Sequence, residues 1–188
     1  YALNKIGHTS PEPESLSWCI GPPLKQSFKL LLCTDDDTLS EKALEYYRER
    51  FGKKGLFENK LYPGISETLE ELVNRGFTLF VATAKPTVYS EKIIAYFRLD
   101  RFFKTVYGSE LDGTRTDKKD LISYILEQEK LNSESVVMVG DREHDIIGAS
   151  ANRIPGIGVL WGYGSRQELT AAGAHFCIGQ PRQLTEIF

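Results

Sequence analysis

The chain has 188 residues, of which 41% are hydrophobic and 26% are charged, and its formal net charge is −3. This balance is ordinary for a globular protein, and without a basic patch it argues against a nucleic-acid partner. No apolar run approaches the roughly 20 residues that cross a bilayer, so we expect no membrane partner. Three widely spaced cysteines without a CxxC pair are typical of a reduced, cytoplasmic setting.

Residues 1 to about 62 are expected to be helical, because they contain no convincing strand pattern. The rigid turn Gly21-Pro22-Pro23 should open a helix that runs to about Leu32. A second helix should follow, since Leu44, Tyr47 and Phe51 fall on one stripe at helical spacing.

An acidic stretch, Thr34-Asp35-Asp36-Asp37-Thr38, lies between these two expected helices. It is similar to the nucleophile loop of some phosphatases, but no glycine follows Asp37 to permit the tight turn that such a loop needs. The residues before it also have helical rather than strand spacing. We interpret the stretch as the start of the second helix, with Thr38 and Glu41 as a capping box.

From Tyr62 onward, apolar runs of strand length alternate with stretches of helical spacing. Repeated units of this kind predict an α/β fold with a doubly wound parallel sheet. The run 136–139 is continuously apolar and is expected to be a strand covered on both faces. The expected strands are 77–82, 105–107, 136–139, 157–160 and 176–178, with helices opening after Gly64 and at Lys85-Pro86 and covering 117–128, 143–152 and 167–172.

Two carboxylates follow the strand 136–139, at the edge where open α/β sheets bind their ligands. Asp141 comes directly after Gly140, and Asp145 lies four positions later, so both can face one crevice. Two hard oxygen donors with few other ligands nearby suit Mg²⁺, which keeps several waters and bridges to phosphate. The alternative is that Asp141 caps the next helix and Asp145 is a solvated acid in its first turn.

Two further strand ends carry groups that can bind phosphate. Thr83 and Ala84 follow the strand 77–82, where a helix opened by Pro86 would present a hydroxyl and free N–H groups to an anion. A hydroxyl at such a position is also common simply as a helix cap. Lys118 lies in the first turn of another helix, where it opposes the helix dipole unless it has a specific role. Together with the carboxylate pair, these groups are the equipment for phosphoryl transfer.

The order of these motifs resembles the haloacid dehalogenase superfamily, and within it the phosphoglycolate phosphatase-like branch. The resemblance makes Thr83 the phosphate ligand of the second motif and Lys118 the lysine of the third. Asp141 would hold Mg²⁺, and Asp145 would hold it directly or through water. The resemblance rests on Tyr62-Pro63-Gly64, Val81-Ala82-Thr83-Ala84-Lys85-Pro86, Gly108-Ser109-Glu110-Leu111-Asp112-Gly113, Lys118 and Val139-Gly140-Asp141-Arg142-Glu143-His144-Asp145.

One motif of that family is absent from the 188 residues. Its nucleophile is the first aspartate of a DxDGT motif, on a strand that precedes the cap domain and lies centrally in the sheet. Residues 1–62 resemble the helical cap and 63–188 the α/β core, so we expect roughly twenty further N-terminal residues that supply this strand. Without them two strands would lack a ladder partner, and the chain as printed would be inactive.

These expectations favour a Mg²⁺-dependent phosphomonoester hydrolase that acts through an aspartyl-phosphate. The branch suggests a small-molecule phosphate ester as substrate, either phosphoglycolate or a nucleoside monophosphate as for a 5'-nucleotidase. The alternatives are a non-catalytic binding relative and a phospho-receiver signalling domain. The receiver is disfavoured, because its acidic pair comes first in the chain, whereas here Asp141 and Asp145 follow Thr83 and Lys118. The oligomeric state cannot be inferred from the sequence.

Overall fold

The computed structural model describes residues 1–188, which form two compact units, Tyr1–Asn59 and Lys60–Phe188. No helix in either unit is both long enough and apolar enough to pass through a bilayer.

The first unit contains only helices, as the sequence predicts. Its core is formed by buried side chains of α1, α3 and the α2 region, namely Ala2, Leu3, Phe28, Leu32 and Ala43. Phe28 and Leu32 are four residues apart and therefore lie on one face of α2 and its C-cap. The elements are α1 (Ala2–Lys5), the 3-10 helix Pro13–Cys19, α2 (Leu24–Leu31), α3 (Asp37–Lys53) and the 3-10 helix Gly55–Phe57.

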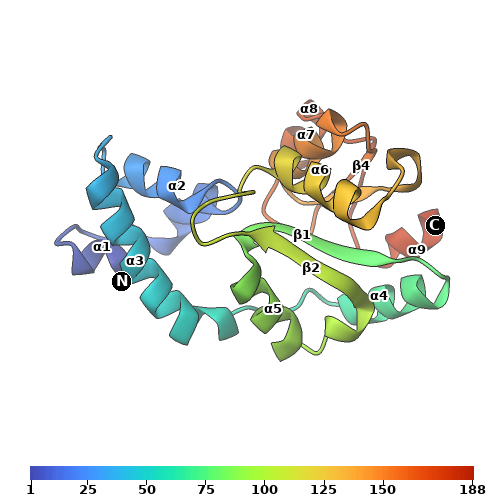
Figure 1. Ribbon diagram of the computed structural model, residues 1–188, viewed down its shortest axis with the longest axis horizontal. Helices are drawn as coiled ribbons and strands as arrows, with labels where there is room; N and C mark the ends of the chain where they lie inside the picture. Colours follow the sequence, from blue (N-terminus) through green and yellow to red (C-terminus); the bar gives the residue numbers. More distant parts are fainter. The chain divides into compact units, whose positions relative to one another are not determined.

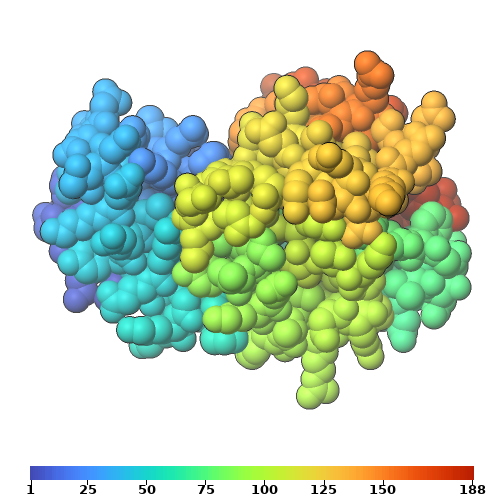
Figure 2. Space-filling model, in the orientation of Figure 1, coloured from blue at the N-terminus to red at the C-terminus, as the bar shows by residue number.

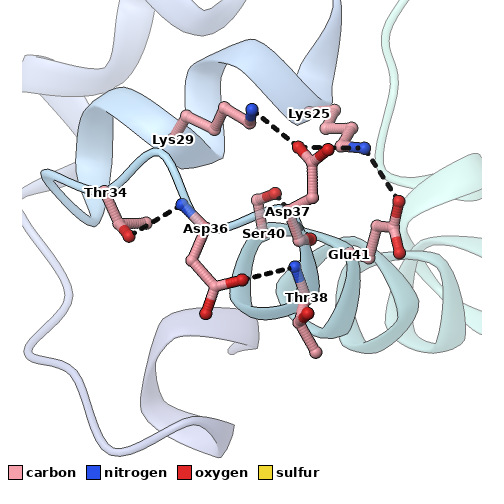
Figure 3. A network of polar contacts seen from close by, with 8 residues as sticks. All are labelled: Lys25, Lys29, Thr34, Asp36, Asp37, Thr38, Ser40 and Glu41. Carbon is pink, nitrogen blue, oxygen red and sulfur yellow. Dashed lines mark hydrogen bonds and ion pairs between the residues drawn. The ribbon is translucent and has the colours of Figure 1, made fainter.

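The acidic stretch between α2 and α3 is the start of a helix, as predicted, but its cap differs from the predicted one. Asp36 is the N-cap, and its carboxylate accepts a hydrogen bond from the backbone N–H of Thr38 at 2.8 Å (Figure 3). Thr34 supports the turn, since its hydroxyl accepts from the N–H of Asp36 at 3.0 Å. The predicted capping box of Thr38 and Glu41 is therefore wrong, because the carboxylate two residues earlier fits the same N–H group.

Glu41 instead belongs to an ion-pair network between α2 and α3. Figure 3 shows the ammonium groups of Lys25 and Lys29 directed at the Asp37 carboxylate, at 3.3 and 2.6 Å, while Lys25 also contacts Glu41 at 2.8 Å. The hydrogen bond from Lys29, followed by that from Lys25, lowers the pKa of Asp37. Because lysines one turn apart face acids one turn apart, the network aligns the two helices.

The second unit alternates helices and strands, as the sequence predicts. In Figure 1, α6 lies on one side of β1 and β2 and α5 lies on the other, as in a doubly wound fold. In Figure 2, β2, the loop that follows it and α6 (yellow-green to yellow) form much of the visible surface of this unit. The elements are α4 (Ile65–Asn74), β1 (Leu79–Pro86), α5 (Thr87–Tyr96), β2 (Phe103–Ser109), α6 (Lys118–Glu129), β3 (Met138–Gly140), α7 (Glu143–Ala151), β4 (Gly156–Val159), α8 (Arg166–Ala171), β5 (Phe176–Ile178) and α9 (Gln183–Ile187), with 3-10 turns at Asp100–Phe102 and Ser133–Ser135.

All strand pairs are parallel, which confirms the predicted fold class, but the strands form two hydrogen-bonded sheets. One sheet has the order β1-β2, and the other has the order β3-β4-β5. Every residue of β4 is buried, because β4 has a strand on both sides. β1 and β3 each have one strand partner, and β1 is only half-buried throughout. Val137 and Val139 pack against one hydrophobic cluster and Val136 and Met138 against another, so the run 136–139 is covered on both faces as predicted, although its side chains are less completely buried than those of β4.

The two sheets share a hydrophobic core even though no ladder joins them. Ile157 and Val159 of β4 are buried with Ile178 of β5, and Leu79 of β1 packs against the same cluster as Val139 of β3. Leu72 of α4 and Leu184 of α9 complete this cluster, so α9, which the sequence analysis did not predict, covers part of the core.

The helix that follows β1 begins later than predicted. The strand continues through Lys85 and Pro86, and α5 begins at Thr87. Pro86 pairs with Ser109 of β2, whose hydroxyl donates to the carbonyl of Ala84 at 2.8 Å, and these contacts hold the segment extended. The residue before a proline also avoids the helical region, which disfavours a helix at Lys85.

A buried carboxylate joins the end of α6 to β2. The side chain of Glu129 is 9% exposed and forms an ion pair with Lys104, while it accepts a hydrogen bond from the Tyr107 hydroxyl at 2.7 Å. Its bond with Lys104, followed by that with Tyr107, lowers the pKa of Glu129. Burial and then the bond to Glu129 raise the pKa of Tyr107 to about 12. The network therefore favours an ionised Glu129 beside a neutral Tyr107.

Replacing Glu129 by glutamine should destabilise the protein more at neutral pH than in acid. A lowered pKa in the folded state stabilises the fold above the unfolded-state pKa of about 4.3, and this contribution is lost as the pH falls through the folded-state value. In thermal unfolding, the difference in Tm between the parent and Glu129→Gln should be larger at about pH 7 than at about pH 3.5. Glu127→Gln, at an exposed position of the same helix, is the control. A difference of equal size at both pH values would contradict the assignment.

Candidate phosphate and metal site

Lys118, the predicted lysine, is held in the interior by two contacts. Its ammonium donates a hydrogen bond to the carbonyl oxygen of Ala82 at 2.7 Å and forms an ion pair with Asp145 at 3.0 Å. The two charged side chains are 9% and 12% exposed, respectively. The neighbouring Lys119 is exposed, so the two adjacent lysines differ in their surroundings, and the role predicted for Lys118 stays a prediction. The ion pair also compensates the unfavourable position of Lys118 in the first turn of α6.

Two glycines make room for this ion pair. A Cβ atom at Gly148 of α7 would lie 2.8 Å from Cγ of Lys118 and 3.0 Å from its backbone carbonyl carbon. A Cβ atom at Gly140 would lie 2.3 Å from Cβ of Asp145. These distances are shorter than real carbon contacts, so larger residues would displace the start of α6 or the side chain of Asp145.

Asp145 has a second partner in the loop that begins α7. Its Oδ2 atom accepts from the backbone N–H of Arg142 at 3.2 Å, while Oδ1 faces Lys118. Asp145 is buried in the first helical turn, where negative charge is favourable. The alternative of a solvated first-turn acid is therefore wrong.

Asp141 is held by a different loop. Its Oδ2 atom accepts a hydrogen bond from the backbone N–H of Tyr163 at 2.8 Å, and its Oδ1 atom accepts none from the protein. The N-cap position of α7 is occupied by Arg142. Asp141 is thus not the helix cap that the sequence left open as an alternative, and one of its oxygens remains available to a ligand.

Thr83 lies within β1 and not at a helix start, which corrects the predicted geometry. Its hydroxyl oxygen accepts from the N–H of Lys85 at 3.2 Å. The structure brings Lys118 to the carbonyl of the preceding residue, Ala82, and so beside the part of β1 that contains Thr83 and Ala84. No direct contact joins Thr83 to Asp141 or Asp145, so their action on one phosphoryl group stays a prediction.

Sequence reasoning missed a third loop, which follows β4. This loop contributes Tyr163, and the first turn of α8 after it contributes Glu168, whose Oε1 atom accepts from Nε of Arg142 at 2.8 Å and from the N–H of Glu143 at 3.0 Å. Burial opposes the charge on Glu168, but the hydrogen bonds from these donors outweigh it and lower the pKa of Glu168. The signal in the sequence was Trp161-Gly162-Tyr163-Gly164, a glycine-rich turn directly after a strand.

Asp141 and Asp145 fit Mg²⁺ in donor type but do not form a complete cage. Carboxylate oxygens are the ligands that this ion prefers, and it usually keeps several waters beside one or two carboxylates. No group of three or more histidine, cysteine, aspartate or glutamate side chains that could hold a metal occurs in the structure. The two carboxylates would therefore need further oxygen ligands from water, a substrate or another carboxylate.

Comparisons with known proteins identify the family to which the chain belongs. The model of the haloacid dehalogenase-like hydrolase family matches residues 1–159. A curated 5'-nucleotidase of Pseudomonas aeruginosa is 47% identical over 99% of this chain and 85% of that protein. A phosphoglycolate phosphatase of Vibrio parahaemolyticus is 26% identical over 89% of this chain and 73% of that protein.

A solved structure agrees with this result. The crystal structure of a predicted phosphatase from Clostridium acetobutylicum superimposes with a TM-score of 0.94 at 42% sequence identity, over 100% of this chain and 86% of that one. The resemblance inferred from the motifs is thus confirmed over nearly the whole chain. The chain belongs to the haloacid dehalogenase-like hydrolase family, as a relative of its phosphatases.

Proposed function

We propose that this protein hydrolyses a small phosphomonoester with the help of Mg²⁺. The observation that carries the proposal is the buried ammonium of Lys118, fixed between Asp145 and the carbonyl of Ala82 in the middle of β1. A cation held rigidly where a phosphoryl group can bind stabilises the negative charge that develops on its oxygens. Thr83 and the N–H group of Ala84 would add hydrogen bonds to the same group.

The metal would be held by Asp141 and Asp145. When bound, Mg²⁺ would neutralise charge on the phosphoryl oxygens and orient them. The Oδ1 atom of Asp141, which accepts no hydrogen bond from the protein, supports this assignment. In the absence of the ion, Lys118 screens the charge of Asp145.

We infer that the nucleophile is an aspartate on a further parallel strand. β1 and β3 each keep one edge without a strand partner, and an unpaired backbone edge inside a sheet is costly. A strand there would place a carboxylate beside Lys118. That carboxylate would attack phosphorus as the bond to the leaving alkoxide breaks, and water would then hydrolyse the aspartyl-phosphate. A second aspartate would give its proton to the alkoxide and recover one from that water.

The names of the relatives suggest two substrate classes. The Pseudomonas relative is called a 5'-nucleotidase and the Vibrio relative a phosphoglycolate phosphatase. The higher identity to the former leads us to place nucleoside monophosphates first. Residues 1–62 would act as a cap that selects the leaving group. The three cysteines are free thiols, which supports a cytoplasmic location.

The full-length protein should release inorganic phosphate from members of a phosphomonoester panel, with and without Mg²⁺. Lys118→Ala should lower kcat/KM by about 10²-fold or more, because it removes a preorganised charge at the transferring group. Lys119→Ala is the matched control, since it deletes an exposed lysine one position away and should leave kcat/KM unchanged. Hydrolysis that persists undiminished in EDTA or in Lys118→Ala would refute the assignment, and no hydrolysis of any ester would favour a non-catalytic binding protein.

The ion pair between Lys118 and Asp145 should also be measurable as stability. Lys118→Met leaves the Asp145 carboxylate buried without its partner, at a cost of about 3 kcal/mol in the free energy of unfolding. Asp145→Asn should likewise destabilise the protein, because it leaves the ammonium of Lys118 buried without its charged partner. The double variant should lose clearly less than the sum of the single losses, as urea unfolding would measure. Strict additivity would mean that the pair contributes no coupling.

A further inference from the structure

We propose that the segment 161–168, which we call the β4–α8 clamp, positions the metal-binding loop 141–145 and sets its affinity for Mg²⁺. The inference rests on the proposed function, because it takes Asp141 and Asp145 as the metal ligands. It assigns a role to residues that do not themselves bind the ion and that the sequence analysis did not select.

The first contact of the clamp fixes the carboxylate of Asp141. The backbone N–H of Tyr163 donates to Oδ2 of Asp141 at 2.8 Å, which fixes that oxygen and leaves the other, Oδ1, without a hydrogen bond from the protein. A backbone donor is well suited to this task, because it cannot rotate away as a side chain can. The carboxylate therefore has one defined orientation before the ion arrives.

Two glycines allow the clamp to come this close. A Cβ atom at Gly162 would lie 2.2 Å from Oδ2 of Asp141 and 2.3 Å from its Cβ. A Cβ atom at Gly164 would lie 2.0 Å from the carbonyl oxygen of Asp141. Neither position can carry a side chain without moving Asp141, so the glycines shape the metal-binding loop directly.

The second contact of the clamp fixes the other part of the loop. Glu168 accepts from Nε of Arg142 at 2.8 Å and from the N–H of Glu143, the first residue of α7, at 3.0 Å. Its own position is set by Ser165, the N-cap of α8, whose hydroxyl accepts from the N–H of Glu168 at 3.0 Å. The backbone of Arg142, thus anchored, donates to Asp145.

The clamp therefore touches the loop beside both proposed ligands. It holds Asp141 directly, and it holds Asp145 through Arg142. Groups that orient metal ligands from outside the coordination sphere commonly change metal affinity by about 10- to 100-fold when they are replaced. Loss of the clamp should thus appear as weaker metal binding, even in the absence of substrate.

The test is titration of the full-length, metal-free protein with Mg²⁺ alone by calorimetry, supported by Mn²⁺ binding followed by electron paramagnetic resonance. Gly162→Ala should raise the Kd for Mg²⁺ by about 10-fold or more. Gly179→Ala is the matched control, because its Cβ atom would meet only the Gln183 side chain at 3.7 Å. Its Kd should equal that of the parent protein.

Glu168→Gln is a second variant that keeps the size and an acceptor oxygen but removes the charge that pairs with Arg142. Glu168→Gln should raise the Kd for Mg²⁺ several-fold. If circular dichroism shows that Gly162→Ala is unfolded, the Kd of Glu168→Gln tests the proposal instead. If the parent binds Mg²⁺ and the folded variants bind it equally well, the clamp is refuted while the proposed function stands. If the parent does not bind Mg²⁺ at all, both proposals are refuted together.

Discussion

The ion pair between Lys118 and Asp145 is the interaction on which the rest of the second unit depends. It links the first turn of α6 to the first turn of α7, and the hydrogen bond to Ala82 extends the link to β1. Three segments distant in sequence thus meet at one ammonium group. Because both charges are largely withdrawn from water, the cost of their burial is repaid only while the geometry is kept. This requirement explains why glycines lie directly beneath both side chains.

Asp141 is packed as closely as Lys118 and Asp145. Around Lys118 the close packing is between two helices, whereas around Asp141 it is between two loops that follow neighbouring strands, β3 and β4. Parallel pairing of β3 with β4 brings the ends of these strands together, so the loop after one can donate backbone hydrogen bonds to the loop after the other. The architecture of the sheet thereby places the backbone N–H of Tyr163 beside the carboxylate of Asp141, without the use of a polar side chain.

The separation of the strands into two sheets has a direct physical consequence for the site. β4 satisfies both of its edges and is fully buried, whereas β1 and β3 each leave one edge unpaired and stay partly exposed. These two edges belong to the strands that carry Thr83 and precede Asp141. The unpaired edges of β1 and β3 thus belong to the strands nearest to the proposed chemistry.

Much of the fold could be predicted from the sequence, because periodicity and turn residues act locally. The helical character of residues 1–59, the alternation of strands and helices after them, and the identity of β5 all followed from local patterns. The start of α5 could not be predicted, because the extended conformation of Lys85 and Pro86 is held by pairing with β2. The cap of α3 was placed two residues late, because Asp36 and Thr38 are both good caps and only the chain geometry chooses between them.

By itself, the sequence determined the family, the α/β class and the residue types that carry the proposed chemistry, Thr83, Lys118, Asp141 and Asp145. The α/β class follows from hydrophobic spacing, which acts locally, whereas the family and the roles proposed for these four residues came from the resemblance of the motifs. Only the tertiary structure decided that Lys118 is paired with Asp145 and that Tyr163 and Glu168 hold the loop 141–145. Contacts between loops of different strands depend on how the strands are ordered in the sheet, and no local pattern in the sequence encodes that order.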